Sequence, residues 1–167
     1  MSMRHTFNWG SHIPLLIKVI EHTVGDVLEL GMGWYSTPLL HWMCSDMKRN
    51  LYSYENNKGY FDLFQNGLNE FHKTYLIDSY EGIGVDKNWG VVFIDINPME
   101  IRAPLALSLS KCADTIVVHD SEYREEKFYH YRELLYPAFK YRYDYTKFRP
   151  NTSVFSNFNS LEFLDEY

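Results

Sequence analysis

VLELGMGWYST, residues 27–37, is the stretch that decides the fold of this chain. Its first four residues have the apolar character of a buried strand that carries one acid, Glu29, and a Gly-x-Gly turn follows at Gly31 and Gly33. A helical pattern begins at once over residues 37–43. Glycine allows positive φ angles and lets a ligand approach the backbone, while the first helical turn offers free N–H donors. The stretch therefore predicts a nucleotide-sized binding site between a strand and a helix.

The acid in this stretch indicates the charge of the ligand. Glu29 stands two residues before Gly31, where it would repel a pyrophosphate and attract an ammonium group. Ser36 occupies the third glycine position of the dinucleotide-binding fingerprint, a further mismatch to that motif. We therefore expect a positively charged ligand. We expect its contacts to come from Glu29, Gly31 and Gly33, and from Ser36 and Thr37 at the start of the helix.

The sequence ELGMG, residues 29–33, resembles the first motif of the class I S-adenosylmethionine (SAM)-dependent methyltransferases. SAM carries an α-ammonium and a sulfonium beside its adenosine, which agrees with an acid at this position. The resemblance implies SAM as cofactor and methyl transfer as the reaction. Taken alone, the motif also fits an ordinary turn between a strand and a helix.

Composition limits the class of protein and its partners. The chain has 167 residues, 46% of them hydrophobic and 23% charged, as expected for one folded, soluble domain. The net charge is −6 and there is no run of Lys or Arg, so we expect no extended nucleic-acid surface and favour a small-molecule or sugar acceptor. No apolar segment is long enough for a signal peptide or a membrane span. Cys44 and Cys112 do not have the spacing of a disulfide framework or a zinc site, and unpaired thiols favour a reducing compartment, so we expect the cytoplasm. The sequence does not decide the oligomeric state, and a homodimer is one alternative.

Strand and helix patterns alternate along the chain. We expect helices over residues 13–22, 37–43, 61–71, 102–112 and 122–139, the first capped by Ser11, and strands over 26–30, 50–54, 73–77, 89–94, 114–118, 141–148 and 153–158. This order predicts an α/β fold, a doubly wound and mostly parallel seven-stranded sheet with helices on both faces. The last two strands have no helix between them and must form an antiparallel hairpin.

The same order of elements divides the single domain into three parts. Residues 1–24 are expected to form an N-terminal helical cover, 25–139 a Rossmann-like core and 140–167 the terminal β-hairpin. A terminal hairpin distinguishes the methyltransferase sheet from the dehydrogenase sheet. The resemblance to class I methyltransferases thus covers nearly the whole chain.

Each predicted parallel strand ends in an acid, at the edge where open α/β sheets bind ligands. Glu55 follows the second strand, and its carboxylate can accept hydrogen bonds from both ribose hydroxyls. Asp78 and Ser79 resemble the family position that contacts the adenine amino group. The alternatives are a helix cap near Glu55 and a simple turn at Asp78.

Asp95 and Asp120 end two strands that should be neighbours about 4.8 Å apart, so a positive group is expected between them. Both resemble the metal ligands of catechol-type O-methyltransferases, which implies Mg²⁺ held by Asp95 and Asp120. Ser121 stands where that family commonly has Asn. A basic side chain is the alternative partner; the candidates are Arg102, Lys111 and Arg124.

Two histidines complete the predicted site. His119-Asp120 resembles the His-Asp pair that closes the fifth strand of several sugar-directed methyltransferases, so we expect His119, Asp120 and Asp95 to be catalytic, with His119 as a base. His12 is expected near the cofactor, because the first helix in this family lies over the same edge. A histidine that only bonds a neighbouring loop is the alternative interpretation of His119.

The resemblance implies a SAM-dependent methyltransferase acting on an oxygen, less favourably a nitrogen, of a small molecule or sugar. A SAM- or nucleoside-binding protein without turnover, such as a partner subunit, is the second interpretation. An NAD-dependent oxidoreductase is the third, and Ser36 and Glu29 disfavour it.

Overall fold

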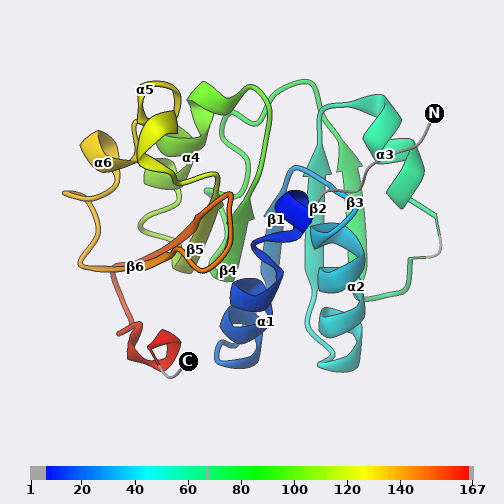
Figure 1. Ribbon diagram of the computed structural model, residues 1–167. Helices are drawn as coiled ribbons and strands as arrows, with labels where there is room; N and C mark the ends of the chain where they lie inside the picture. The colour runs from blue at the N-terminus through cyan, green and yellow to red at the C-terminus, as the bar shows by residue number, and fades with distance from the viewer. Residues whose placement is uncertain (1–6, 67, 166–167) are drawn as a thin grey trace.

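The computed structural model describes residues 7–66 and 68–165, and it contains one seven-stranded sheet with the order β3-β2-β1-β4-β5-β7-β6 (Figure 1). The strands are β1 (Val27–Leu30), β2 (Leu51–Glu55), β3 (His72–Leu76), β4 (Trp89–Ile94), β5 (Ala113–His119), β6 (Tyr141–Tyr145) and β7 (Thr152–Ser156). Strands β1 to β5 pair in parallel, whereas β7 runs antiparallel to both β5 and β6. The predicted fold class is confirmed, including the terminal antiparallel hairpin.

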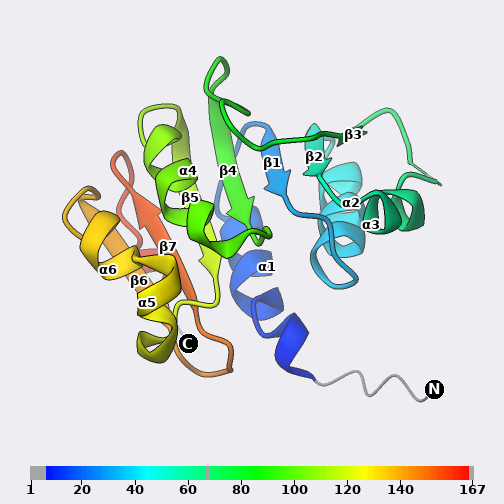
Figure 2. The same cartoon turned by 90° about the horizontal axis from the view of Figure 1, so that it is seen from above.

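Helices cover both faces of this sheet. They are α1 (Ile13–Glu21), α2 (Ser36–Asp46), α3 (Lys58–Phe64), α4 (Arg102–Ser108), α5 (Glu126–Tyr129) and α6 (Tyr131–Leu134), with short 3₁₀ turns η1 (Phe7–Gly10), η2 (Met99–Ile101), η3 (Tyr123–Glu125) and η4 (Glu162–Leu164). Helices α1 and α2 pack on one face, and α4 packs on the other with α6 (Figure 2). No helix in the described ranges is long and apolar enough to cross a membrane.

The strands divide their side chains between two cores. Leu28 and Ile94 belong to the core under α4, whereas Val27, Phe93 and Val117 belong to the core under α1 and α2. This division follows from the alternation of side chains along a strand. Asp95 and His119, two residues after Phe93 and Val117, therefore lie on the α1 side of the sheet.

The predicted helix over residues 61–71 is shorter and earlier than expected. Helix α3 begins at Lys58, because the Asn57 side chain accepts hydrogen bonds from the N–H groups of Gly59 and Tyr60. It ends at Phe64 and has no buried residue. A helix that packs little apolar surface gains little from further turns.

The predicted helix over residues 122–139 is broken. His130 has a left-handed backbone, with φ of 53°, and separates α5 from α6. In a continuous helix, residues two apart project about 200° apart around the axis. The break instead lets Tyr129 and Tyr131 both turn inward, where their rings stack with centroids 5.1 Å apart. The remaining predicted elements differ from the observed ones mainly at their ends.

Candidate active site

A cleft of about 590 Å³ opens at the carboxyl edge of the parallel strands. Its residues fall into two groups, which we call the glycine end and the ionic end. The glycine end comprises Gly31, Met32, Gly33, Glu55, Asn56, Asn57 and Tyr60, and the ionic end comprises His12, Asp95, Arg102, His119 and Asp120. Trp9, Trp34, Tyr35, Ser36, Ile96, Asn97 and Pro150 complete the lining. The cleft thus lies where open α/β sheets bind their ligands.

The two glycines of the turn serve different purposes. Gly31 has φ of 92°, and a Cβ there would lie 2.1 Å from the carbonyl oxygen of Asp95. At Gly33 a Cβ would meet only the Ser36 Oγ, at 3.6 Å. Gly31 is therefore required by the contact between β1 and the end of β4, whereas Gly33 leaves room on the cleft side.

Glu29 does not line the cleft, contrary to the expectation that it meets the ligand. It is fully buried, and its carboxylate accepts hydrogen bonds from Ser53 Oγ at 2.5 Å and Thr37 Oγ1 at 2.9 Å. Thr37 Oγ1 in turn accepts from the N–H of Gly33 at 2.9 Å. Burial raises the pKa of Glu29 to about 7. Because β1 alternates its side chains, Glu29 faces α2, and with Thr37 it supports the glycine turn from behind.

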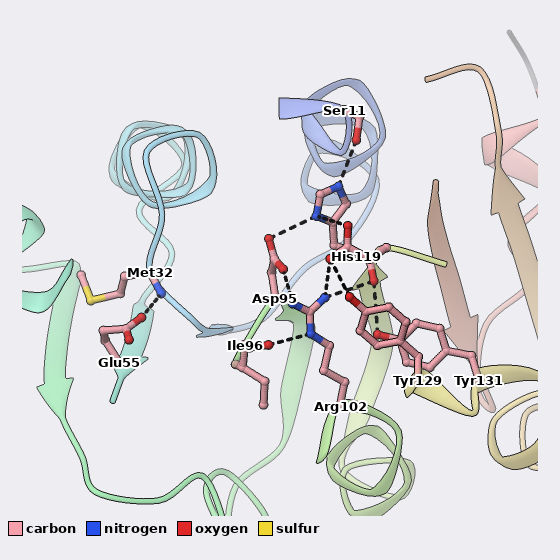
Figure 3. A network of polar contacts seen from close by, with 10 residues as sticks. Ser11, Met32, Glu55, Asp95, Ile96, Arg102, His119, Tyr129 and Tyr131 are labelled. Carbon is pink, nitrogen blue, oxygen red and sulfur yellow. Dashed lines mark hydrogen bonds and ion pairs between the residues drawn. The ribbon is translucent and has the colours of Figure 1, made fainter. Parts of the chain in front are cut away.

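Glu55 lies in the cleft and is fixed by backbone amides. Its Oε2 accepts a hydrogen bond from the N–H of Met32 at 2.8 Å (Figure 3). Its Oε1 accepts one from the N–H of Asn57 at 2.6 Å. Burial raises its pKa above the ordinary value, although these amide hydrogen bonds oppose that shift. A carboxylate has about four lone-pair sites, so it can also accept a hydrogen bond from a hydroxyl donor. Glu55 thus joins the glycine turn to the end of β2.

Asp78 and Ser79 lie outside the cleft. Both are exposed beyond the end of β3, and neither lines the cavity. The cleft next to Glu55 is lined instead by Asn56, Asn57 and Tyr60. The expected contact between Asp78-Ser79 and an adenine amino group therefore has no support in the geometry.

Arg102 is the positive group between the two aspartates at the ionic end. Its guanidinium bonds Asp95 Oδ1 at 2.8 Å and Asp120 Oδ2 at 2.9 Å, and its Nε donates to the Ile96 carbonyl at 2.7 Å (Figure 3). Burial alone would raise the pKa of Asp95, but His119 and Arg102 hold it well below the ordinary range. The expected Mg²⁺ between Asp95 and Asp120 does not fit, because the guanidinium occupies that position.

His119 is buried at the end of β5, with both ring nitrogens in contact with polar groups. Its Nε2 lies 2.9 Å from Ser11 Oγ, and its Nδ1 lies 3.2 Å from Asp95 Oδ2 and 3.6 Å from Asp120 Oδ1. Burial opposes the charged ring, yet Asp95 raises the pKa of His119 above the ordinary value. The ring is therefore held in one orientation, with Nε2 directed at Ser11 and Nδ1 directed at the two aspartates.

Asp120 and two tyrosines complete the ionic end. Asp120 has φ of 60°, an uncommon angle for a residue with a side chain, and functional sites concentrate such conformations. Tyr129 donates to Asp120 Oδ2 at 3.2 Å, and Tyr131 donates to the His119 carbonyl at 3.2 Å. Both tyrosines come from the segment broken at His130.

His12 lines the cleft from the start of α1. It is buried, with its ring centroid 4.9 Å from that of Phe93 and 4.7 Å from that of His119. Burial lowers the pKa of His12 to about 3, so the ring is neutral. It thus adds an uncharged imidazole to the ionic end.

Sequence reasoning missed the roles of Ser11, Tyr129 and Pro150. Ser11 does not cap α1; its hydroxyl donates to the Pro150 carbonyl at 2.6 Å and contacts His119. No local pattern predicts a contact between residues 139 positions apart. The role of Tyr129 is not apparent from the sequence either, because its inward direction depends on the break at His130, which apolar spacing does not reveal.

The fold was compared with known proteins. No protein-family model matches the sequence, and no curated protein matches it significantly. Among solved structures, spermidine synthase from Thermotoga maritima superposes with a TM-score of 0.64 and 10% identity, over 94% of this chain and 62% of that one. The METTL16 MTase domain superposes with a TM-score of 0.60 and 14% identity, over 89% of this chain and 67% of that one.

A third structure adds a bound ligand to the comparison. The RNA methyltransferase from Salinibacter ruber, in complex with S-adenosyl-L-homocysteine, superposes with a TM-score of 0.53 and 10% identity, over 89% of this chain and 93% of that one. The fold is that of the class I methyltransferases. At these identities the likeness concerns the fold alone, and the neighbours include a synthase, so the reaction must be argued from the site.

Proposed function

We propose that this protein is a SAM-dependent methyltransferase that transfers a methyl group to an oxygen of a small molecule or sugar. The observation that carries the proposal is Glu55, a carboxylate held in the cleft by two backbone amides beside the glycine turn. A fixed carboxylate is suited to accept hydrogen bonds from a ribose diol. When bound, SAM supplies an activated methyl group on its sulfonium.

The glycine end supports binding of an uncharged nucleoside rather than a pyrophosphate. The N–H of Met32 is engaged by Glu55 and the N–H of Gly33 by Thr37, so these two donors of the turn are directed to the protein itself. A dinucleotide site needs such donors for its phosphates. This arrangement disfavours the NAD-dependent oxidoreductase.

The ionic end supports an oxygen acceptor. Asp120 Oδ2 is held by Arg102 and Tyr129, while Oδ1 has only the 3.6 Å contact with His119 among the described residues. A hydroxyl group can donate to this oxygen and be oriented by it. Asp120 is the residue to which we assign acceptor positioning, and the net charge of −6 favours a neutral acceptor over a polyanion.

Calorimetric titration of the full chain with SAM, S-adenosylhomocysteine and NAD tests the proposal. We expect saturable binding of SAM and its product, and weak or absent binding of NAD. Incubation with methyl-labelled SAM and a panel of sugars and catechols should then yield labelled acceptor. Binding of SAM without release of label would favour the non-catalytic alternative, and tight binding of NAD alone would overturn the proposal.

We also propose the cytoplasm as the compartment of this protein. Cys44 and Cys112 are both free thiols, and burial raises the pKa of Cys44 to about 12. Free thiols fit a reducing compartment. Expression of a tagged chain followed by fractionation tests this assignment.

A further inference from the structure

We propose that His12, Asp95 and His119 bind a divalent transition-metal ion at the ionic end of the cleft. One ligand atom from each residue lies within 4.8 Å of the other two. The three side chains come from the start of α1 and the ends of β4 and β5, and all of them line the cleft. This site is distinct from a metal between Asp95 and Asp120, a position that Arg102 fills.

The hydrogen bonds around His119 determine what its Nδ1 faces. The Ser11 hydroxyl has a single proton, which it donates to the Pro150 carbonyl at 2.6 Å. Ser11 Oγ must therefore accept its 2.9 Å contact from Nε2–H of His119. Nδ1 then points at Asp95 Oδ2, 3.2 Å away, and only a second proton or a metal ion makes that contact favourable.

His12 distinguishes a metal ion from a second proton. Its side chain is buried, and within the described ranges neither Nδ1 nor Nε2 has a hydrogen-bond partner. Buried polar nitrogens are costly when they are left unpaired. A proton on His119 leaves His12 without a partner. A metal ion would instead be coordinated by one nitrogen of each histidine and one oxygen of Asp95.

The spacing suits a metal ion after a small adjustment. Ligand atoms at about 2.0–2.1 Å from a tetrahedral ion lie about 3.3 Å apart. The 3.2 Å between His119 Nδ1 and Asp95 Oδ2 already has this length. The ligand nitrogen of His12 lies within 4.8 Å of the other two ligand atoms, so it must move closer for one ion to bind all three.

The ligand types indicate which metals the site would take. Two imidazoles and one carboxylate suit zinc, iron, cobalt and other divalent first-row ions better than Mg²⁺, which prefers oxygen ligands. Three protein ligands that line a cleft leave a coordination position open to it, as in catalytic zinc sites.

Neighbouring groups orient the proposed ligands. Arg102 binds Asp95 through Oδ1, which leaves Oδ2 directed at His119, and Ser11 fixes the His119 ring through Nε2. Arg102 also pairs with Asp120, so its single positive charge is divided between two carboxylates and Asp95 is only partly neutralised. Such outer hydrogen bonds set the tautomer and direction of metal ligands.

A metal here would extend the proposed function by binding and polarising the acceptor oxygen beside Asp120. This last step rests on the proposed methyl transfer. Binding of the ion does not, since it can be measured without SAM or acceptor.

Titration of the chelator-treated full chain with Zn²⁺ and with Co²⁺ tests the proposal. We expect one equivalent of either ion to bind, with a Co²⁺ absorption spectrum typical of nitrogen and oxygen ligands. Mg²⁺ should not compete. The absence of saturable Zn²⁺ and Co²⁺ binding would overturn the proposal and favour a protonated His119.

Variants locate the ion. His12→Asn and Asp95→Asn should weaken binding by more than the roughly 10- to 100-fold that loss of an outer partner costs, and Ser11→Ala by about that range. Matched controls are His22→Gln and Asp114→Asn at exposed positions, which should bind as the wild type does. Circular dichroism verifies the fold of each variant. If His12→Asn does not fold, Ser11→Ala and the Co²⁺ spectrum of the wild type decide the question.

Two outcomes separate this proposal from the proposed function. Methyl transfer by a chain that shows no saturable Zn²⁺ or Co²⁺ binding would refute the metal site but not the transferase. Metal binding that requires His12 and Asp95, in a chain that binds no SAM, would refute the transferase but not the metal site. Binding of the ion that is unchanged in both variants would refute this site.

Discussion

The two ends of the cleft are organised by different interactions. At the glycine end, Glu55 is held by neutral backbone N–H groups of Met32 and Asn57. At the ionic end, Arg102 joins Asp95 and Asp120 through charged side chains. The first arrangement follows from a strand, a turn and a neighbouring strand end, whereas the second requires residues from separate elements to meet. Loss of the Glu55 side chain should therefore disturb the glycine end less than loss of the Arg102 side chain disturbs the ionic end.

Loss of Arg102 should have the largest effect. Arg102→Met leaves Asp95 and Asp120 without their shared partner, and removing one member of a buried ionic group costs about 3–5 kcal/mol of unfolding free energy. Urea denaturation measures this loss. Arg124→Met, at an exposed ion pair, is the control and should change stability little. A loss below about 1 kcal/mol for Arg102→Met would contradict the buried ionic cluster.

Glu29 should make stability depend on pH. Its pKa is raised to about 7 in the folded chain from a reference value of 4.5. Folding therefore favours the protonated acid, and this stabilisation is complete below about pH 4.5 and lost as pH rises through 7. The wild type should lose about 3 kcal/mol relative to Glu29→Gln between these values, measured by urea denaturation across the pH range. A difference between the wild type and Glu29→Gln that stays constant with pH would refute the prediction.

Glu55 tests the glycine end directly. Glu55→Ala should weaken SAM binding by about 1–3 kcal/mol, the value of hydrogen bonds to a charged group. Calorimetric titration measures the change, and Glu70→Ala should bind SAM as the wild type does. Unchanged affinity in Glu55→Ala would remove this residue from the cofactor site. Stability should change less than in Arg102→Met.

Asp78 should have the smallest effect. The residue is exposed and lies outside the cleft, so Asp78→Ala should alter SAM affinity by less than about 0.5 kcal/mol. The same titration detects the difference. A loss comparable to that of Glu55→Ala would restore the adenine contact that the sequence motif implies.

The fold could be predicted well because its signals are local. The buried runs of β4 and β5 and the glycine turn after β1 each lie within a short window of sequence. The broken helix at His130 could not be predicted from apolar spacing, because its cause is the inward turn of two tyrosines toward the ionic end.

The site could be predicted only in part. The carboxyl edge, Glu55, and the need for a positive group between Asp95 and Asp120 follow from strand order and charge. The choice of Arg102 over a metal ion at that position depends on how α4 enters the edge after β4, which spacing does not reveal. The burial of Glu29 could not be predicted either, because it depends on α2 covering that face of β1.

The antiparallel direction of β7 has a consequence for how such a cleft can diversify. Thr152, the first residue of β7, lies beside His119, the last residue of β5, so the turn before β7 stands at the rim and Pro150 lines the cleft. Turns accept insertions and replacements that buried strands do not. One wall of the cavity can therefore lengthen or shorten over evolution while the sheet stays unchanged.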